Sequence, residues 1–383
     1  TGFAANVGIT RQSTIDMDIK GKRGYIKPDS EEDVSITKTF SMTEAITPFG
    51  VTHDDPFRSA MTFIQTSKHS MRTKASAPLL ITNGADEAIP HMTTDKFAFK
   101  AKDKGKVSEL VPNDYMIITY DNGGSDFINL KESIEKNSDG GMYILLHLVP
   151  DFKVGQRFKK DDIVAHDKMS FSNNVGGNDN LAYNVGALVK VALPNTDMGY
   201  EDSTACSHWM TEALSSDVII KKEITLSPNT NVYELVKPGQ PIQEGDPLIL
   251  FQNSFEEKDA NLLLKNITDD ELVSDLGRIR LRSHYTGMIQ DVVVYRTQPT
   301  ETYSESIQKI INDFDKRVAK KKALYKKYKI PGVNKIEPDY PLPPTGELKN
   351  VGDGIKINVF IKYHDKFSVG DKNVAQSAAK GVN

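Results

Sequence analysis

Three short runs of the sequence hold residue types that could do chemistry. His53, Asp54 and Asp55 place an imidazole beside two carboxylates, as a metal site would, but the same residues also form a natural turn and helix start. Cys206 and His208 would lie on one face of a strand as a thiol–imidazole pair, although a small buried cysteine is the more common case. The glycine-rich run 176–179 lacks the lysine of a phosphate-binding loop. None of these runs predicts a catalytic centre by itself.

The composition excludes several classes of protein. The chain has 383 residues, which predicts about two or three domains. Its single cysteine excludes an internal disulfide and a cysteine-based zinc site, and fits a reducing compartment. No apolar run approaches the roughly 20 residues that span a bilayer, and the first residues lack the order of a signal peptide. The net charge is −4, so a polyanion could be bound only locally, in a groove or channel.

Short apolar stretches between turn-forming residues predict a mainly β chain from about residue 112 onward. They are 115–120, 141–149, 185–193, 218–226, 247–251, 287–296 and 354–363. Residues 356–362 alternate polar and apolar types, which is typical of a half-buried strand. Residues 155–164 match 239–248 in register at Gly, Gln, an apolar residue, Asp and a second apolar residue. This internal similarity predicts a turn motif that occurs twice.

Two segments, 57–71 and 301–330, have helical patterns. In the second, Thr302 and Glu305 fit a capping box, and Pro331 ends the pattern. Its apolar stripe comprises Ile307, Ile310, Ile311, Phe314, Val318, Tyr325 and Tyr328. The second half of this helix is strongly basic. We expect a solvated helix face there, with a contact to a nucleic-acid backbone or an acidic partner as the alternative.

Three separated segments resemble, in the same order, the β subunit family of multisubunit DNA-dependent RNA polymerases. Residues 45–61 are similar to the family's IPFxxHDDxxRxxM stretch. Residues 181–203 resemble its strand ending in GYNFED, with two fewer residues before the Glu-Asp pair and with His208 where the bacterial pattern has glutamate. Residues 367–382 resemble GDKxxxxxxxKGV, although Val-Ala-Gln-Ser-Ala replaces the usual Gly-Arg-His-Gly. Residues 287–294 resemble the strand that closes the β-flap.

The resemblance implies the C-terminal part of a split β subunit, as in phiKZ-like giant bacteriophages. The expected fold is mainly β with α/β segments, built as a double-psi β-barrel plus a flap-like insertion and one long helix. The expected parts are an N-terminal α/β segment next to the nucleotide site at 1–111, the first part of the barrel at 112–216, the flap-like insertion at 217–345 with helix 301–330, and the second, lysine-bearing part of the barrel at 346–383. The segments near residues 202 and 372 would meet in one barrel, which would continue beyond residue 383.

Four residues take catalytic roles under this resemblance. Lys372 and Lys380 would contact the phosphate at the growing RNA end, where an ammonium group in a partly desolvated site stabilises phosphate charge. Asp202 would reach a second, transient Mg²⁺, with Glu201 behind it, because adjacent residues of a strand point to opposite faces. The resemblance therefore predicts a phosphate-binding site rather than a complete catalytic centre.

Three basic residues are the expected nucleotide contacts: Arg58, Lys68 and Arg72. Lys68 falls about where the family has a triphosphate-contacting arginine, but lysine lacks the arginine fork. The family's metal-binding DFDGD run is absent from this sequence, so the chain is expected to be inactive alone. Its expected partners are a β N-terminal-like chain, β′-like chains that carry DFDGD and hold Mg²⁺, DNA template, RNA and nucleoside triphosphates, with no membrane.

Location and rival functions complete the expectations. A virus-encoded enzyme of this kind would work in the cytoplasm of the infected bacterium, with packaging in the virion as an alternative. One rival function is a subunit of another two-barrel polymerase, such as the archaeal-type DNA polymerase large subunit, which lacks the first segment's motif. The other is a non-catalytic β-barrel scaffold, because a fold does not fix a function. A scaffold would keep the activity of its assembly when both lysines are replaced by alanine.

Overall fold

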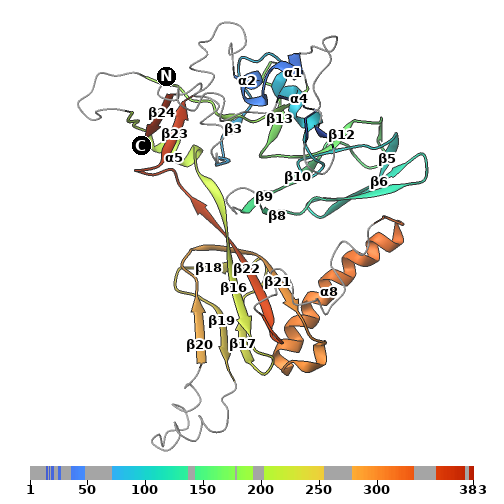
Figure 1. The fold of residues 1–383 in the computed structure, drawn as a ribbon, viewed down its shortest axis with the longest axis vertical. Coiled ribbons are helices and arrows are strands. Elements are labelled where there is room, and N and C mark those ends of the chain that lie inside the picture. The colour runs from blue at the N-terminus through green and yellow to red at the C-terminus, as the bar shows by residue number, and fades with distance from the viewer. Residues whose placement is uncertain are drawn as a thin grey trace, which may run out of the picture.

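The computed structural model describes residues 14–15, 17, 19–20, 25–26, 36–47, 71–136, 143–176, 179–192, 202–253, 278–331, 351–375 and 379–383. The fold is mainly β and includes a curled, half-barrel sheet (Figure 1). This confirms the coarse prediction of the fold class. No helix in the described part of the chain is long and apolar enough to cross a membrane.

The N-terminal part contains short helices and strands. The helix Met42–Ile46 begins with a capping box. The Ser41 hydroxyl accepts a hydrogen bond from the Glu44 amide, and the Glu44 carboxylate accepts one from the Ser41 amide. The predicted helix over 57–71 lies outside the described residues except for Met71, which is not helical. The elements are β1 (Ile19–Lys20), β2 (Tyr25–Ile26), α1 (Ile36–Thr39), α2 (Met42–Ile46), β3 (Ser76–Ala77) and α4 (Ala85–Met92).

Module A consists of two sheets, with strand orders β10-β12-β4 and β11-β5-β6-β7. Val107, Met116, Ile118 and Val164 are buried in the core between them. Gly105 has no room for a side chain, because an added Cβ would collide with the carbonyl of Thr119. The strands are β4 (Ala98–Lys100), β5 (Gly105–Val111), β6 (Tyr115–Tyr120), β7 (Ser125–Asn129), β10 (Leu148–Pro150), β11 (Arg157–Phe158) and β12 (Ile163–Asp167).

Module B consists of sheet β17-β19-β20 and of the four strands β18-β21-β22-β16, which β9 and β8 extend to six. Its core includes Ile249, Ile289, Ile357 and Val359. The strands are β16 (Ser216–Leu226), β17 (Asn231–Leu235), β18 (Pro241–Ile242), β19 (Pro247–Gln252), β20 (Arg278–Arg282), β21 (Gly287–Arg296) and β22 (Ile355–Asp365), with β8 (Ser133–Lys136) and β9 (Tyr143–Leu146) beside them.

The two modules share one arrangement of strands in circularly permuted chain order. In module A, β11 pairs with β5 at Phe158 and Gly105; in module B, β18 pairs with β21 at Ile242 and Gly287. Both β5 and β21 carry a bulge at the same place, as do the β12–β4 and β19–β20 pairs. The order β4-β5-β6-β7-β10-β11-β12 corresponds to β20-β21-β22-β16-β17-β18-β19. The chain therefore contains the same arrangement of strands twice, and it enters this arrangement at a different strand in each module.

The predicted turn motif occurs in both modules and explains the internal similarity. Its glycines, Gly155 and Gly239, have φ of 80° and 84°, a conformation that disfavours other residues. The Gln and Asp side chains each accept a hydrogen bond from a backbone amide three residues earlier. These bonds are Lys153 N to Gln156 at 3.0 Å, Lys159 N to Asp162 at 2.7 Å, Lys237 N to Gln240 at 3.1 Å, and Gln243 N to Asp246 at 2.7 Å.

The long helix α8 (Glu305–Lys327) follows the 3₁₀ turn η2 (Thr300–Thr302). Its N-cap is Ser304, whose hydroxyl accepts from the Ile307 amide at 3.4 Å. The predicted cap at Thr302 is therefore wrong, because residues 300–302 form a separate turn. The helix ends at Lys327, and Lys329, with φ of 53°, turns the chain away two residues before Pro331.

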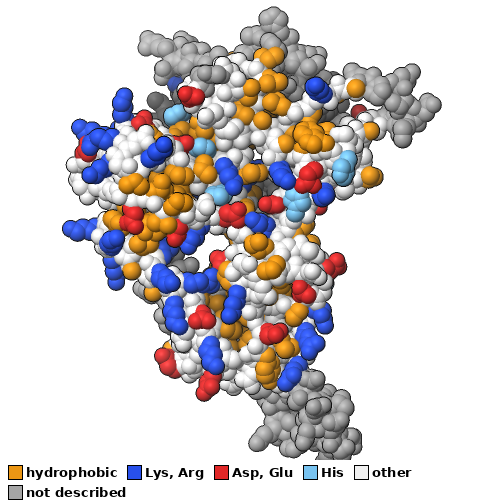
Figure 2. Space-filling view, turned by 180° about the vertical axis from the view of Figure 1, so that it is seen from behind, with side chains coloured by type: hydrophobic (Ala, Val, Ile, Leu, Met, Phe, Trp, Pro, Cys, Tyr) orange, Lys and Arg blue, Asp and Glu red, His pale blue; other side chains and the backbone are white. Residues whose placement is uncertain are grey.

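Helix α8 contacts both modules. Its first half buries Ile307, Ile311 and Phe314 in the core of module B. Near the end of α8, the centroid of the Tyr325 ring lies 5.1 Å from that of the Phe127 ring in module A. The Tyr328 hydroxyl, just after the helix, donates a hydrogen bond to the Glu109 carboxylate of module A. Figure 2 shows Lys and Arg side chains gathered on the side of the molecule where α8 lies. The predicted apolar stripe is thus confirmed. Its first half packs in the core of module B, and its end contacts Phe127 of module A.

Strand β22 is more deeply buried than predicted. It is not half-buried, since Lys356 and Asn358, on the face opposite the core residues Ile357 and Val359, are only 5% and 2% exposed. Lys356 pairs with Glu223 at 3.1 Å, which satisfies its buried charge. Residues 355–365 share one sheet with β16 and β21, which lie before the predicted division at 345/346. The division at 111/112 likewise falls inside the β5–β6 hairpin.

The remaining elements lie outside modules A and B. They are β13 (Phe171–Asn173), β14 (Leu181–Tyr183), β15 (Gly186–Ala187), α5 (His208–Ala213), β23 (Lys372–Ala375) and β24 (Ala379–Val382). Strand β15 pairs with β3, and β23 pairs with β24. Among the described residues, β23 and β24 have one further strand contact, a parallel bridge from Val382 to Ser203. A closed barrel is not formed by these pairings.

Candidate functional site

The predicted lysine-bearing segment forms the hairpin β23–β24. Lys372 pairs with Val382, and Val374 pairs with Lys380. Because side chains alternate along a strand and cross-strand partners share a face, these four residues lie on one face of the hairpin. The two lysines are diagonal neighbours, at a backbone separation of about 7–8 Å. Both lysines are exposed, beside valines that are 52% and 41% exposed.

A tight turn fixes the start of this hairpin. The Asp371 carboxylate accepts from the Ser368 amide at 2.8 Å, and Gly370 adopts a φ of 95°. Two backbone hydrogen bonds join the start of β23 to the end of β24. Gly370 N donates to the carbonyl of Asn383, and Asn383 N donates to the carbonyl of Asp371, both at 2.9 Å. The backbone before Lys372 is therefore held in place by hydrogen bonds on both sides.

The segment at 202–204 pairs with the outer edge of β24, and the Thr204 side chain lies by Asn373 and Gly381, which are on the face opposite the lysines. Val382 N donates to the carbonyl of Asp202, and Thr204 N donates to the carbonyl of Val382, both at 2.9 Å. Asn373 adds a side-chain bond to the Thr204 hydroxyl at 2.7 Å. Gly381 leaves no room for a side chain there, since an added Cβ would lie 2.7 Å from the Thr204 methyl group. The predicted meeting of these two distant segments is observed.

Asp202 lies at this junction with an exposed side chain and a φ of 48°, an unusual conformation for a residue other than glycine. Its carboxylate forms no hydrogen bond with the described residues. Glu201 lies outside them. Ser207, which matches the serine that the polymerase family's motif has five residues after its aspartate, caps α5 by accepting from the Met210 amide at 3.3 Å. One motif residue therefore has a structural task, while Asp202 is open to a ligand.

The thiol–imidazole pair does not have the predicted backbone. Residues 204–207 are not a strand, and His208 is the first residue of α5. Cys206 is partly exposed rather than buried, and desolvation raises the pKa of its thiol. A raised pKa keeps the thiol protonated at neutral pH, so Cys206 is not an activated nucleophile.

Helix α5 is fastened beside the hairpin by Glu212. Hydrogen bonds from Lys74 and Lys366, at 3.1 and 3.3 Å, hold the pKa of this exposed carboxyl down to about 2. The backbone adds a bond from Phe367 N to the carbonyl of Thr211 at 3.2 Å. These contacts connect α5 to the segment that leads into β23, so the hairpin and residues 202–204 are tied together through two routes.

The predicted nucleotide-binding residues are not brought together by the described part of the chain. Arg58 and Lys68 lie outside it. Arg72 donates to Asp167 at 2.6 Å, to Ser170 at 3.1 Å and to the carbonyl of Leu145 at 2.5 Å. Asp167 is fully buried and needs this partner. The contacts of Arg72 fit a structural anchor rather than a nucleotide contact.

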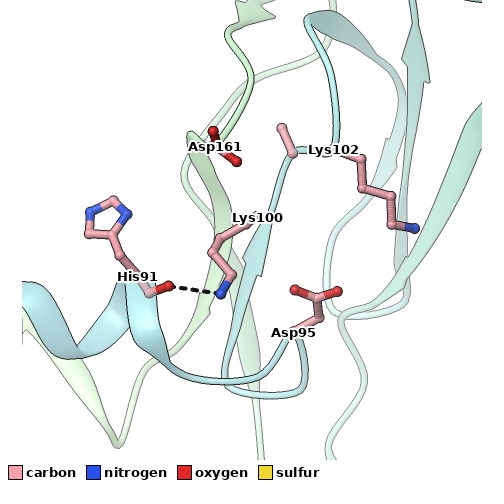
Figure 3. A pocket seen from close by; sticks show the side chains of 6 residues that line it. His91, Asp95, Lys100, Lys102 and Asp161 are labelled. Carbon is pink, nitrogen blue, oxygen red and sulfur yellow. Dashed lines mark hydrogen bonds between the residues drawn. The ribbon is translucent and has the colours of Figure 1, made fainter. Parts of the chain in front are cut away.

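A shallow cavity of about 450 Å³ lies in module A, at the end of α4 (Figure 3). Its cations already have protein partners. Lys100 donates to the carbonyls of His91 and Thr93 at 2.9 and 2.7 Å, and Lys102 pairs with Asp126 at 2.7 Å. The open shape and the occupied lysines do not favour a phosphate ligand, so the cavity is not the candidate site.

Metal ligands are sparse at the hairpin. Among the described residues, no group of three or more His, Cys, Asp or Glu side chains could hold a metal ion. Asp202 is the predicted ligand that can be placed, and one carboxylate does not complete the oxygen shell that Mg²⁺ requires. A Mg²⁺ ion at this position would need ligands from elsewhere.

Two residues that join the site were not predicted. Thr204 and Asn373 link the motif segments, although 169 positions separate them. Their polar type inside the two motifs is the only sequence signal, and it does not indicate a partner. No protein-family model matches this chain, and no match is found among curated proteins.

Proposed function

We propose that this chain is the C-terminal part of a split β subunit of a multisubunit, DNA-dependent RNA polymerase. The observation that carries the proposal is the docking of residues 202–204 on the hairpin that presents Lys372 and Lys380 on one face. Both segments carry motifs that resemble the polymerase family, and the motifs lie about 170 residues apart in the sequence. A chance resemblance gives no reason for the two segments to form one unit.

The lysine face suits the binding of phosphate groups. Nucleotidyl transfer builds negative charge on the reacting phosphate and on the departing pyrophosphate. Lys372 and Lys380 would bind and orient the phosphate at the growing RNA end, and two ammonium groups would neutralise that charge. Val374 and Val382, exposed on the same face, would be covered once partner chains and RNA are bound, and the lower local polarity would then strengthen the attraction. Asp202, on the adjacent segment, would face the incoming triphosphate.

The rest of the centre would come from partner chains. Magnesium supplies the charge neutralisation that this chemistry needs, and we propose that a β′-like chain with DFDGD holds it, with Asp202 as an additional ligand. A β N-terminal-like chain would carry the remaining lobes. The hairpin and its bridge to Ser203 would be part of a double-psi β-barrel. The enzyme would be virus-encoded and would work in the host cytoplasm on DNA template, RNA and nucleoside triphosphates.

Purification of the chain from its native source at mild salt tests the proposal. Mass spectrometry should identify a partner with the DFDGD run and a partner similar to the β N-terminal half. The purified assembly should extend an RNA primer on a DNA template in the presence of Mg²⁺. A chain that purifies as a monomer, or an assembly with no RNA extension, would contradict the proposal and would favour the non-catalytic scaffold.

A further inference from the structure

The outer face of α8 carries a stripe of lysines. Residues 309–329 contain nine Lys and Arg residues and two carboxylates, Asp313 and Asp315, in a chain of net charge −4. Four lysines follow one another at spacings of seven, four and seven residues, which places them on one side of the helix, away from the buried Ile307 and Phe314. We call this set, which spans about 27 Å, the α8 stripe; it comprises Lys309, Lys316, Lys320 and Lys327.

The positive charge of this region is only partly neutralised. Lys316 lies 3.6 Å from Asp313, and Lys327 lies 3.7 Å from Glu109, both exposed pairs of little strength. Four exposed lysines of α8 and its end have no carboxylate partner among the described residues: Lys309, Lys320, Lys326 and Lys329. Their charge faces solvent.

Folding does not explain this charge. The apolar side of α8 is already packed on both modules, through Ile311 and Tyr325 among others. Lysine in the last turn complements the helix dipole, but Lys316 and Lys320 precede that turn. These two residues lie four positions apart, where like charges repel and weaken a helix. A sequence that keeps such repulsion along an exposed stripe indicates a polyanionic ligand.

We propose that the α8 stripe binds the sugar-phosphate backbone of duplex DNA without reading its sequence. A straight, rigid stripe of about 27 Å matches a stiff rod of phosphates better than a flexible chain, since phosphates follow each strand at about 3.4 Å along the axis. Lysine offers a point charge rather than the fork that reads guanine. The inference does not depend on the polymerase proposal, because it rests on charge and helix geometry alone.

A triple substitution of the stripe tests the inference. The stripe variant is Lys309→Gln/Lys316→Gln/Lys320→Gln. The control variant, Lys153→Gln/Lys190→Gln/Lys237→Gln, removes the same charge from exposed lysines outside α8. Binding of the full chain to a fluorescein-labelled, mixed-sequence 20-base-pair duplex would be followed by anisotropy between about 50 and 200 mM salt, a range over which phosphate contacts weaken strongly.

The wild type should bind with an affinity that falls steeply with salt. The stripe variant should bind at least about tenfold more weakly at the lowest salt, and its salt slope should fall by about one for each lysine removed. The control variant should keep the wild-type slope, and both variants should melt like the wild type. Equal binding by the stripe and control variants would overturn the proposal. Binding of poly-glutamate in preference to the duplex would also overturn it, and would indicate an acidic protein partner.

Discussion

Modules A and B have the same strand pairings, the same bulges and the same glycines, yet the chain enters them at different points. Gly105 and Gly287 occupy equivalent places, and each lies against a carbonyl of the neighbouring strand. The turn that ends near Asp162 comes late in module A, with only β12 after it, whereas its counterpart near Asp246 comes in the middle of module B, after β16 and β17 and before β19, β20, β21 and β22. The comparison shows that local hydrogen bonds and close backbone packing determine the unit, and that chain order does not.

The side chains at equivalent places have diverged. Asp167, at the end of β12, is fully buried and pairs with Arg72, whereas Phe251 occupies the same place on β19 in an apolar core. Lys100 donates to carbonyls at the end of α4, while Arg282 at the equivalent place donates to the carbonyl of Gly245 at 2.6 Å. A duplicated backbone can therefore carry different side-chain chemistry, and function must be argued from sites.

The largest effect should come from the buried Asp167 in module A, whose equivalent place in module B holds Phe251. Arg72→Met leaves the buried Asp167 without its cation and should lower the free energy of unfolding by about 3–5 kcal/mol. The double variant Arg72→Met/Asp167→Leu, which imitates the apolar core of module B, should recover only part of this loss, because Asp167 also accepts hydrogen bonds from the backbone amides of His147 and Ser170. Urea unfolding measures both. If the double variant were no more stable than the single one, the comparison of Asp167 with Phe251 would be wrong.

The equivalent glycines should respond alike. Gly105→Ala and Gly287→Ala each force a methyl group against a backbone carbonyl, and each should destabilise the protein by about 1–3 kcal/mol. Gly186→Ala is the matched control, since nothing lies within 4 Å of the added Cβ. Thermal unfolding would compare the three variants. A neutral result at only one of the two glycines would break the equivalence of the modules.

The turn glutamines should contribute smaller, equal amounts. Gln156→Ala and Gln240→Ala each remove one side-chain bond to a backbone amide in an exposed turn, which should cost about 0.5–1.5 kcal/mol. Urea midpoints measured side by side should agree for the two variants. A clear difference would show that the two turns are not equally important for their modules.

The smallest effect concerns the attachment of α5 rather than either module. Because the pKa of Glu212 is lowered from 4.5 to about 2, its contacts stabilise the folded state above pH 4.5 and are lost as the pH falls toward 2. Trp209, the single tryptophan, lies on α5 and is 66% exposed. Its fluorescence should change across this range while the modules stay folded by circular dichroism. The change should be absent in Glu212→Gln.

The sequence predicted much of the fold and less of its connections. The bounds of β6 and β21 match the predicted strands, and α8 lies within its predicted range. The burial of β22 was missed because the alternation of polar and apolar residues cannot show that the polar face of a strand is also covered. The partner of Arg72 was missed because Asp167 lies 95 positions away. The meeting of residues 202–204 with the hairpin was expected from family resemblance alone, since no local pattern indicates it.

The most direct test of the central claim is RNA primer extension by the assembled complex that carries Lys372→Ala/Lys380→Ala. We expect at least about a 100-fold loss of extension rate, because two charges that stabilise the reacting phosphate are removed from one face. The control Lys190→Ala/Lys237→Ala, on exposed residues elsewhere, should extend normally. Both complexes should retain the same partner chains. Normal extension by the Lys372/Lys380 variant would contradict the assigned site.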